Sequence, residues 1–280
     1  MGRQEMEARD MDYGLPDSTT LDTALALAAR APSVADTQPW RWQIGSRAIH
    51  LYLDPARAAD PDQRGPVLSC GASLHHLRVA LAALGWSAVV RRLPNPAQPD
   101  HLASVRLLRH RPTPVEIALS AAISRRHTDH RHFTSLPIPP GCLGLVTERA
   151  TALGALVRRA TDPAREQVID PSEQRPDPDF AELLVIGTTA DDRTSRLRAG
   201  EALSAVLLTA TNIGLATALL THPLETPELR RTVRTGVLDG TAHPQAVVRI
   251  GWAPTVAGSP EPTLEDARSW ACRSSHAGPC

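Results

Sequence analysis

Two segments of the chain share one pattern of glycines and apolar residues. The sequence Gly-Ala-Ser-Leu at 71–74 opens a helical pattern that closes at Gly85, and Gly-Glu-Ala-Leu at 200–203 opens another that closes at Gly214, with the same spacing of fourteen residues. A β-type run follows each segment. On this evidence, a chance match of two amphipathic helices is an equal alternative. A true repeat predicts tandem duplication of one α+β unit, with the two copies paired around a pseudo-twofold axis.

Apolar spacing divides the rest of the chain into short elements. It predicts helices over 20–30, 71–84, 115–126, 143–159 and 199–213, and strands over 48–53, 88–93, 104–108, 183–187 and 246–250. Residues 161–179 are rich in proline and acidic residues and predict a loop.

The same pattern predicts the domain organisation. We expect a first unit at 18–114 and a second at 115–256, with a flexible N-terminal tail at 1–17 and a C-terminal tail at 257–280. Met6 and Met11 offer alternative starts to Met1, so the sequence does not fix the true start codon.

Charge and composition narrow the class of function. The 280 residues carry 30 basic and 30 acidic side chains, so the protein has no excess positive charge to attract nucleic acid or an anionic membrane. Every basic residue counted there is arginine, which excludes Schiff-base and other lysine chemistry. The longest apolar run is too short to span a membrane. We therefore expect a cytoplasmic protein that acts on a small molecule.

The segment Ala-Pro-Ser-Val-Ala-Asp-Thr-Gln-Pro-Trp-Arg-Trp at 31–42 is the most informative motif. It places four polar residues in a compact loop beyond a helix and follows them with two large flat tryptophans. The polar residues are Ser33, Asp36, Thr37 and Gln38. Such a loop can grip a planar polar ring. A capped turn with two core tryptophans is the alternative.

A second motif, Ser-Arg-Arg-His-Thr-Asp-His-Arg-His-Phe, occupies 124–133. Arg125, Arg126 and Arg131, with Thr128, place forked donors and a hydroxyl at the end of a helix, which suits a phosphate monoester. A solvated basic helix end is the alternative. The histidine spacing fits neither a zinc finger nor a zincin, so we expect no metal.

Other motifs are absent or carry less information. The adjacent His75 and His76 point about 100° apart on a helix and are interpreted as packing and surface residues. The four cysteines show no CxxC spacing, which favours a reduced protein without a zinc site. The chain has no GxGxxG motif after a strand, no Walker A motif, no HExxH and no GxSxG.

Taken together, five ordered segments resemble the nitroreductase-like FMN flavoproteins, and in particular the actinobacterial branch in which two nitroreductase units are fused, the Acg-type proteins. These segments lie at 29–42, 69–86, 126–133, 198–204 and 244–251. The resemblance covers about 18–256 and favours the repeat over a chance match. It implies an α+β, nitroreductase-like fold, in which two tandem half-units form a pseudo-twofold pair with mixed or antiparallel sheets flanked by helices.

The resemblance also implies one composite FMN site per chain. Arg126, Thr128 and Arg131 match the stretch that binds the FMN phosphate, and Ser33, Asp36, Thr37 and Gln38 match the loop that contacts the flavin ring. Leu219 to Thr221, including Leu220, would place backbone N–H groups near the flavin N5. Because the family's dimer is fused in one chain, a monomer would suffice, and a homodimer stays open.

Three features depart from the family pattern. Asp36 stands where the family usually has Asn, and an ionised carboxylate only accepts hydrogen bonds, so it would disfavour reduced flavin. Residues 254–263 contain no Arg, whereas fused members commonly carry an Arg-rich stretch there. The connection from 160 to 183 is short, which predicts a reduced lid over the flavin.

The function implied is an FMN-dependent oxidoreductase that transfers hydride through flavin N5 to or from a small organic substrate. NAD(P)H is the expected electron donor, and the substrate can belong to a biosynthetic pathway. Two alternatives stay open. One is a protein that binds and sequesters FMN without turnover, and the other is a divergent member that has lost FMN.

Overall fold

The structure is a computed structural model of the chain, and it describes residues 14–58, 60–162, 165 and 180–254. The first half contains α1 (Ser18–Ala28), β1 (Trp40–Ile44), β2 (Ile49–Leu53), α2 (Arg64–Ala83), β3 (Trp86–Arg92) and β4 (His101–Arg109). The second half contains α3 (Pro114–Arg125), α4 (Pro140–Thr151), β5 (Leu156–Ala160), β6 (Glu182–Thr188), α6 (Arg193–Asn212), β7 (Ala216–Leu220), α7 (Pro227–Gly236) and β8 (His243–Gly251).

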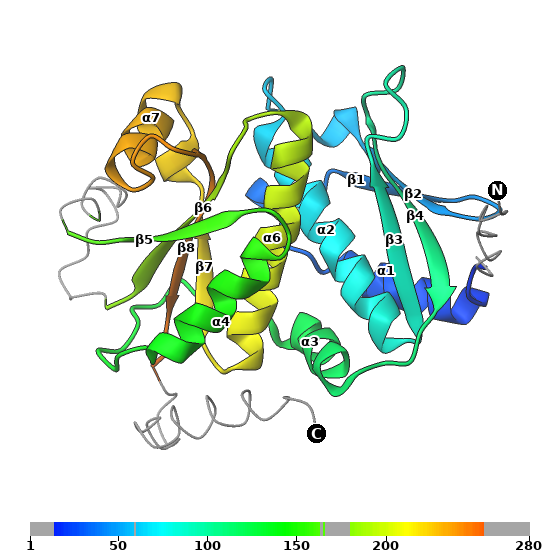
Figure 1. Cartoon of the computed structure of the whole chain (residues 1–280), viewed down its shortest axis with the longest axis horizontal. Coiled ribbons are helices and arrows are strands. Elements are labelled where there is room, and N and C mark those ends of the chain that lie inside the picture. The colour runs from blue at the N-terminus through cyan, green and yellow to red at the C-terminus, as the bar shows by residue number, and fades with distance from the viewer. Residues whose placement is uncertain (1–13, 59, 163–164, 166–179, 255–280) are drawn as a thin grey trace, which may run out of the picture.

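Each half forms one four-stranded antiparallel sheet, and the two sheets have the same topology. The strand order is β1-β2-β4-β3 in the first and β5-β6-β8-β7 in the second, so in each sheet the fourth strand lies between the second and the third. The long helices α2 and α6 lie side by side between the sheets (Figure 1). This arrangement confirms the predicted α+β class and is what a tandem duplication produces.

Local sequence signals explain where several helices begin. Asp17 caps α1 by accepting a hydrogen bond from Thr20 N at 2.9 Å, and Asp192 caps α6 by accepting one from Ser195 N at 2.7 Å. Thr113 and Glu116 form a capping box at α3. These caps satisfy backbone N–H groups that have no partner inside the helix.

The core is aliphatic, as expected for a chain with few aromatic residues. One cluster lies between α1, α2 and the first sheet, and another lies between α4, α6 and the second sheet. Helix α2 is buried nearly all round, because it packs on its own sheet on one side and on α6 on the other. Leu197 of α6 belongs to the first cluster and Leu68 of α2 to the second, so each half contributes to the core of the other.

One predicted element is wrong. The helix expected over 143–159 ends at Thr151, and Leu156–Ala160 is strand β5, which pairs with β6. Gly154 has φ +84°, a conformation that ends a helix and that side chains rarely adopt. The apolar spacing continues across this glycine, which is why it predicts one helix.

Other differences concern boundaries and elements that were not predicted. Helix α2 starts at Arg64 rather than 71, and β1, β7 and α7 were not predicted. Of the expected loop at 161–179, residues 163–164 and 166–179 lie outside the described residues, as do 1–13 of the N-terminal tail and all of the tail at 257–280. Within the part of the chain that the structure describes, no helix has the length and hydropathy needed to cross a bilayer.

Candidate functional site

The loop after α1 has an unusual backbone. It contains a short 3-10 turn, Val34–Asp36, and the residues Ala35, Asp36 and Gln38 have φ of 52°, 51° and 46°. Residues other than glycine rarely adopt this left-handed region, although Asp and Asn do so more often than most. Several such residues in one loop persist only where the surroundings impose them, and they concentrate at functional sites.

Contacts with the first turns of α2 impose this conformation. Val34 N donates to Ser69 Oγ at 3.1 Å, and the Ser69 hydroxyl in turn donates to Gly65 O at 2.8 Å. A Cβ on Gly65 would lie 3.3 Å from the Val34 side chain, so the glycine lets the loop approach the helix closely. The loop therefore lies on the N-terminal half of α2.

The side chains predicted to contact a flavin ring have different local roles. Ser33 Oγ accepts a hydrogen bond from Gln38 N at 3.1 Å, and the Thr37 hydroxyl donates to Val34 O at 3.0 Å, so both shape the loop. Asp36 is exposed, and its carboxylate forms no hydrogen bond or ion pair with the other described residues. The Asp36 carboxylate is therefore available to contact a ligand. Gln38, two residues further on, is half-buried.

The end of α3 meets the start of this loop through two arginines. Arg126 Nη2 donates to Arg30 O at 3.3 Å, and Arg30 Nη2 donates to Ser124 O at 3.2 Å. Each guanidinium therefore binds a carbonyl at the end of the other helix, where a positive charge is favourable. This reciprocal contact joins the two motifs singled out from the sequence, although about a hundred residues separate them.

Among the residues that the structure describes, no acidic side chain pairs with Arg30 or Arg126. Burial and the positive charge of Arg30 lower the pKa of Arg126. Arg126 Nε is buried and has no hydrogen-bond partner among the described residues. Two neighbouring guanidinium groups with unused donors fit an anionic ligand such as a phosphate monoester. The residues present therefore fit the phosphate group of FMN.

The rest of the second motif lies along the edge strand β7. Thr128 forms a parallel bridge with Thr217, and Asp129 N donates to Thr217 O at 2.9 Å. The Arg131 side chain binds Asp129: its Nε and Nη2 donate to the two carboxylate oxygens at 2.9 and 2.6 Å. This fork lowers the pKa of Asp129, which is only 4% exposed.

The other two predicted positions of this motif differ in their surroundings. Thr128 is exposed beside β7, and Arg125 is exposed at the last residue of α3. No hydrogen bond in the described part of the chain joins the Arg125 side chain to Arg126 or to the loop at 31–38. The structure therefore joins Arg126 to Arg30, places Thr128 against β7 two residues further on, and leaves the Arg125 side chain exposed.

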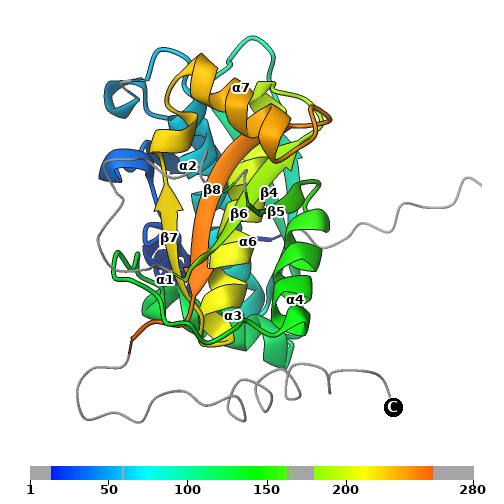
Figure 2. The same ribbon diagram turned by 90° about the vertical axis from the view of Figure 1, so that its left-hand side faces the viewer.

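Leu220 ends β7, and Thr221 follows it at the start of the turn His222–Leu224. Arg230 of α7 holds this turn by donating to Leu224 O at 2.8 Å, and its Nη2 lies 3.9 Å from Asp62 Oδ2, just before α2. The end of β7 is thus connected to the start of α2, on which the loop at 31–38 lies. Figure 2 shows β7 at the sheet edge beside α7.

One face of α2 organises these segments. Gly65, Ser69, Ser73 and His76 recur at the spacing that places residues on one side of a helix. The first two contact the loop, Ser73 Oγ donates to Ala28 O of α1 at 3.1 Å, and His76 lies near Arg30 and Arg126. The candidate site therefore combines a loop from the first half with the α3 end and the β7 end of the second half.

The pseudo-equivalent position on the other side of α2 and α6 is filled. Counting from the matched glycines Gly85 and Gly214, Arg92 at the end of β3 corresponds to Thr221. Arg92 donates to Glu201 at 2.6 and 2.9 Å, and Arg78 donates to the same carboxylate at 2.7 Å. Glu201 is fully buried. A buried ion network therefore surrounds the residue that corresponds to Thr221.

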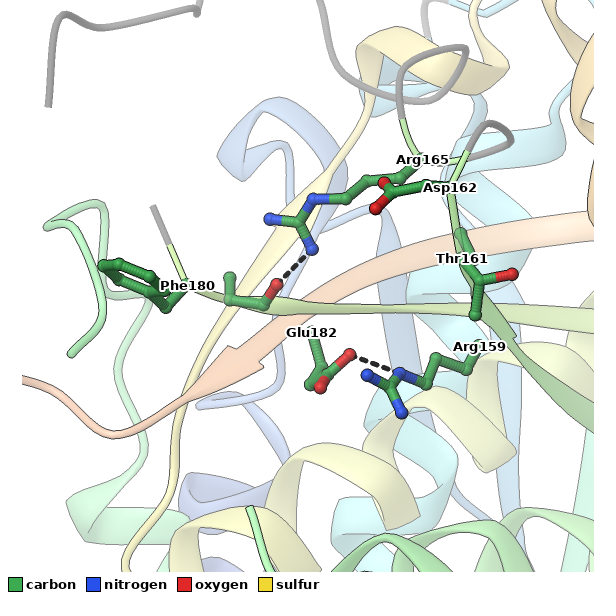
Figure 3. A pocket seen from close by; sticks show the side chains of 8 residues that line it. Arg159, Thr161, Asp162, Arg165, Phe180 and Glu182 are labelled. Atoms are coloured by element: carbon green, nitrogen blue, oxygen red, sulfur yellow. Dashed lines mark hydrogen bonds and ion pairs between the residues drawn. The ribbon is translucent and has the colours of Figure 1, made fainter. Parts of the chain in front are cut away.

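A hollow elsewhere on the surface does not belong to the candidate site. It is lined by Arg159, Thr161, Asp162, Arg165, Phe180 and Glu182, with Arg159 paired to Glu182 (Figure 3). The hollow lies beside β5, whereas the candidate site lies beside β7 at the opposite edge of the same sheet. At about 4.8 Å per strand, three strand spacings separate the two edges.

Comparison with known proteins identifies the family. A Mycobacterium tuberculosis protein named as an NAD(P)H nitroreductase is 38% identical, over 90% of this chain and 91% of its own length. The chain belongs to the nitroreductase-like family. The Acg protein of M. tuberculosis, also named as an NAD(P)H nitroreductase, is a more distant member, 31% identical over 87% of this chain and 92% of its own. No family model matches the sequence.

A solved nitroreductase-like structure shares the fold. A nitroreductase from Anabaena variabilis superposes with a TM-score of 0.56, covering 86% of this chain and 90% of that one at 9% identity. At that identity the likeness concerns the fold alone, and it extends over both halves of the present chain. The resemblance to the Acg-type branch, inferred from five motifs, is confirmed.

The sequence does not single out Arg30, which it predicts only as the last residue of a helix. His76 is buried, which agrees with its interpretation as a packing residue, but the sequence does not show that it lies near Arg30 and Arg126. The cation at the end of α1, directly before Ala-Pro-Ser, was the available signal for Arg30. Nothing in the sequence distinguishes His76 from its neighbour His75, because both lie in the same apolar pattern.

Proposed function

We propose that this protein is an FMN-dependent oxidoreductase that takes electrons from NAD(P)H and acts on a small organic molecule. The observation that carries the proposal is the reciprocal contact of Arg30 and Arg126, which joins a donor-rich helix end to the strained polar loop at 33–38. Family membership supports the reaction class, since two relatives are named as NAD(P)H nitroreductases.

In this proposal the phosphate of FMN binds at the end of α3. Arg126 and the hydroxyl of Thr128 supply donors, and Arg30 adds positive charge from the first half. Because the chain has no lysine, arginine, hydroxyl and backbone groups must meet the phosphate charge. Arg131 acts through Asp129, whose carboxylate it neutralises close to the bound anion.

The flavin ring would lie between the loop at 33–38 and the end of β7. Asp36, Gln38 and the backbone of the loop face its polar edge, and the backbone N–H groups at Leu220 and Thr221 lie on the opposite side. Bound FMN would supply two-electron transfer between NAD(P)H and the substrate. The chain's own part is to orient the ring and to hold its charge.

One chain supplies both halves of the site, so the proposal needs no second subunit. The Glu201 network occupies the pseudo-equivalent position, which supports a single FMN per chain. A flavin content of one FMN per chain in the purified protein would agree with this. A content of two would contradict the assignment of the Glu201 side as closed.

The visible spectrum of the purified protein, recorded before and after addition of FMN, tests the proposal. A protein-bound flavin band that bleaches on anaerobic addition of NADH or NADPH is the expected result. A colourless protein that binds no added FMN would show that FMN has been lost. A yellow protein that neither nicotinamide bleaches would instead favour a role in sequestering FMN.

A further inference from the structure

A histidine buried between the two halves is hydrogen-bonded at one ring nitrogen and has no described partner at the other. His76 is 0% exposed, and its Nδ1 lies 3.1 Å from Ala72 O and 2.8 Å from Ser204 Oγ of α6. Ala72 O can only accept, so Nδ1 carries the proton and donates to it. Nε2 is then an acceptor, and it has no partner among the described residues.

His76 lies on the face of α2 that meets the ends of α1 and α3. Ser73, three residues before it, donates to Ala28 O of α1 at 3.1 Å, and α2 packs on α3, whose end carries Arg126. The two nitrogens of an imidazole point in different directions, so Nε2 faces away from Ser204 and α6. Burial, together with the positive charges of Arg126 and Arg30, lowers the pKa of His76 to about 3. Arg126 Nε–H is also buried without a partner. A donor and an acceptor left unmatched in one buried region call for a shared contact.

We propose that His76 is a positioning residue for the phosphate-binding arginine: its Nε2 accepts the Arg126 Nε–H across no more than one bridging water. Arg126 Nη2 is already fixed on Arg30 O. With Nε also fixed, the guanidinium is held at two points and its Nη1 edge is left for an anion. Because His76 stays neutral, it adds no charge that would repel Arg126. This inference rests on the proposed function.

Ser204 extends the same contact across the interface between the halves. Its Oγ lies 2.7 Å from His75 Nδ1 as well as 2.8 Å from His76 Nδ1. With His76 Nδ1 protonated, the serine hydroxyl donates to His75. The orientation of the His76 ring is therefore set by α6 of the second half, while the arginine that it positions also comes from the second half.

Two variants of His76 separate the roles of its nitrogens. In His76→Asn the amide reaches the place of Nδ1 but leaves nothing at Nε2, whereas His76→Gln places a polar atom near Nε2. Titration of the apoprotein with FMN, followed by quenching of flavin fluorescence, should show about tenfold weaker binding for His76→Asn. For His76→Gln the Kd should stay within about threefold of the original protein.

Riboflavin, which lacks the phosphate, is the matched probe. Its Kd should be the same in both variants and the original protein if His76 acts through Arg126. An equal loss for FMN and riboflavin, or an unchanged FMN Kd in His76→Asn, would overturn the inference. An original protein that binds no FMN would instead refute the proposed function, so the two failures are distinguishable.

If the variants do not fold, the contact between His76 and Arg126 can be tested by NMR on the original protein. Histidine ¹⁵N resonances would be recorded before and after addition of FMN. We expect the Nε2 resonance of His76 to shift on binding, because a phosphate at the Nη1 edge changes the charge distribution of the guanidinium whose Nε–H this nitrogen accepts. A resonance that does not move would overturn the inference.

Discussion

Gly71 of α2 and Gly200 of α6 lie against each other where the two repeat helices cross. A Cβ built on Gly200 would lie 2.8 Å from Gly71 Cα and would clash with Leu68 O, and one on Gly71 would lie 2.9 Å from Gly200 Cα and clash with Leu197 O. The same residues that match between the repeats thus touch at the crossing. This is the expected geometry where a pseudo-twofold axis passes between two helices.

Gly200→Ala should therefore destabilise the protein. Alanine normally favours a helix over glycine by about 1 kcal/mol, but here the added Cβ meets backbone that cannot move aside, and overpacking costs roughly 1 to 3 kcal/mol. We expect the melting temperature to fall. Gly144→Ala in α4 is the control, since a Cβ there meets nothing within 4 Å and should leave stability unchanged or raised. Equal effects of the two substitutions would contradict this account of the crossing.

Asp36→Asn should make reduction of the bound flavin easier. The exposed Asp36 carboxylate lies in the loop proposed to contact the ring, and its charge opposes the anionic reduced form. We expect the two-electron midpoint potential to rise by about 30 mV, equivalent to ~1.4 kcal/mol. Asp22→Asn, an exposed charge change on α1, should leave the potential unchanged. A negative shift in Asp36→Asn would exclude contact between this carboxylate and the ring.

Arg131→Ala should weaken FMN retention by about tenfold, because it leaves the buried Asp129 carboxylate unpaired close to the proposed phosphate site, where its charge opposes the bound anion. Dialysis followed by measurement of bound flavin gives the loss. The double variant Arg131→Ala with Asp129→Asn should recover most of the retention if Arg131 acts through Asp129. Unchanged retention in Arg131→Ala alone would remove this arginine from the site.

The sequence predicted the helices and central strands well where the apolar pattern was long and uninterrupted. Its failure at 156–160 has a local cause, since the pattern runs through Gly154 without a break. β7 was missed because Ala-Thr-Ala-Leu-Leu has no strong β-propensity and is ordered mainly by pairing with β8. Such pairing depends on the tertiary structure and leaves little trace in a short segment.

For the candidate site, the residues alone indicated the two motifs, and only the family resemblance indicated that they meet. The loop at 31–38 and the segment at 124–133 each carry polar residues in an order that the family resemblance explained. Which side chains remain available is a different matter: Ser33 and Thr37 turn inward to hold the loop, and Arg131 is bound by Asp129. These partners follow from backbone positions that no spacing rule provides.

The pH dependence of stability should report the buried His76. Its pKa is about 3 in the folded protein against an ordinary value near 6.5, so below pH 6.5 the unfolded chain takes up a proton that the folded protein resists. The neutral His76 therefore costs no stability above pH 6.5. As the pH falls from 6.5 towards 3, the free energy of unfolding decreases by about 1.4 kcal/mol per pH unit. Urea unfolding at pH 7.5, 6 and 5 measures this loss.

His76→Phe removes the titrating group and keeps an aromatic ring, so its free energy of unfolding should fall less steeply with decreasing pH. We expect the difference in stability between the original protein and the variant to shrink by about 2 kcal/mol between pH 6.5 and 5. Stability curves that stay parallel over this range would mean that His76 is protonated as easily in the folded protein as in the unfolded chain. That result would also remove the neutral acceptor on which the positioning of Arg126 depends.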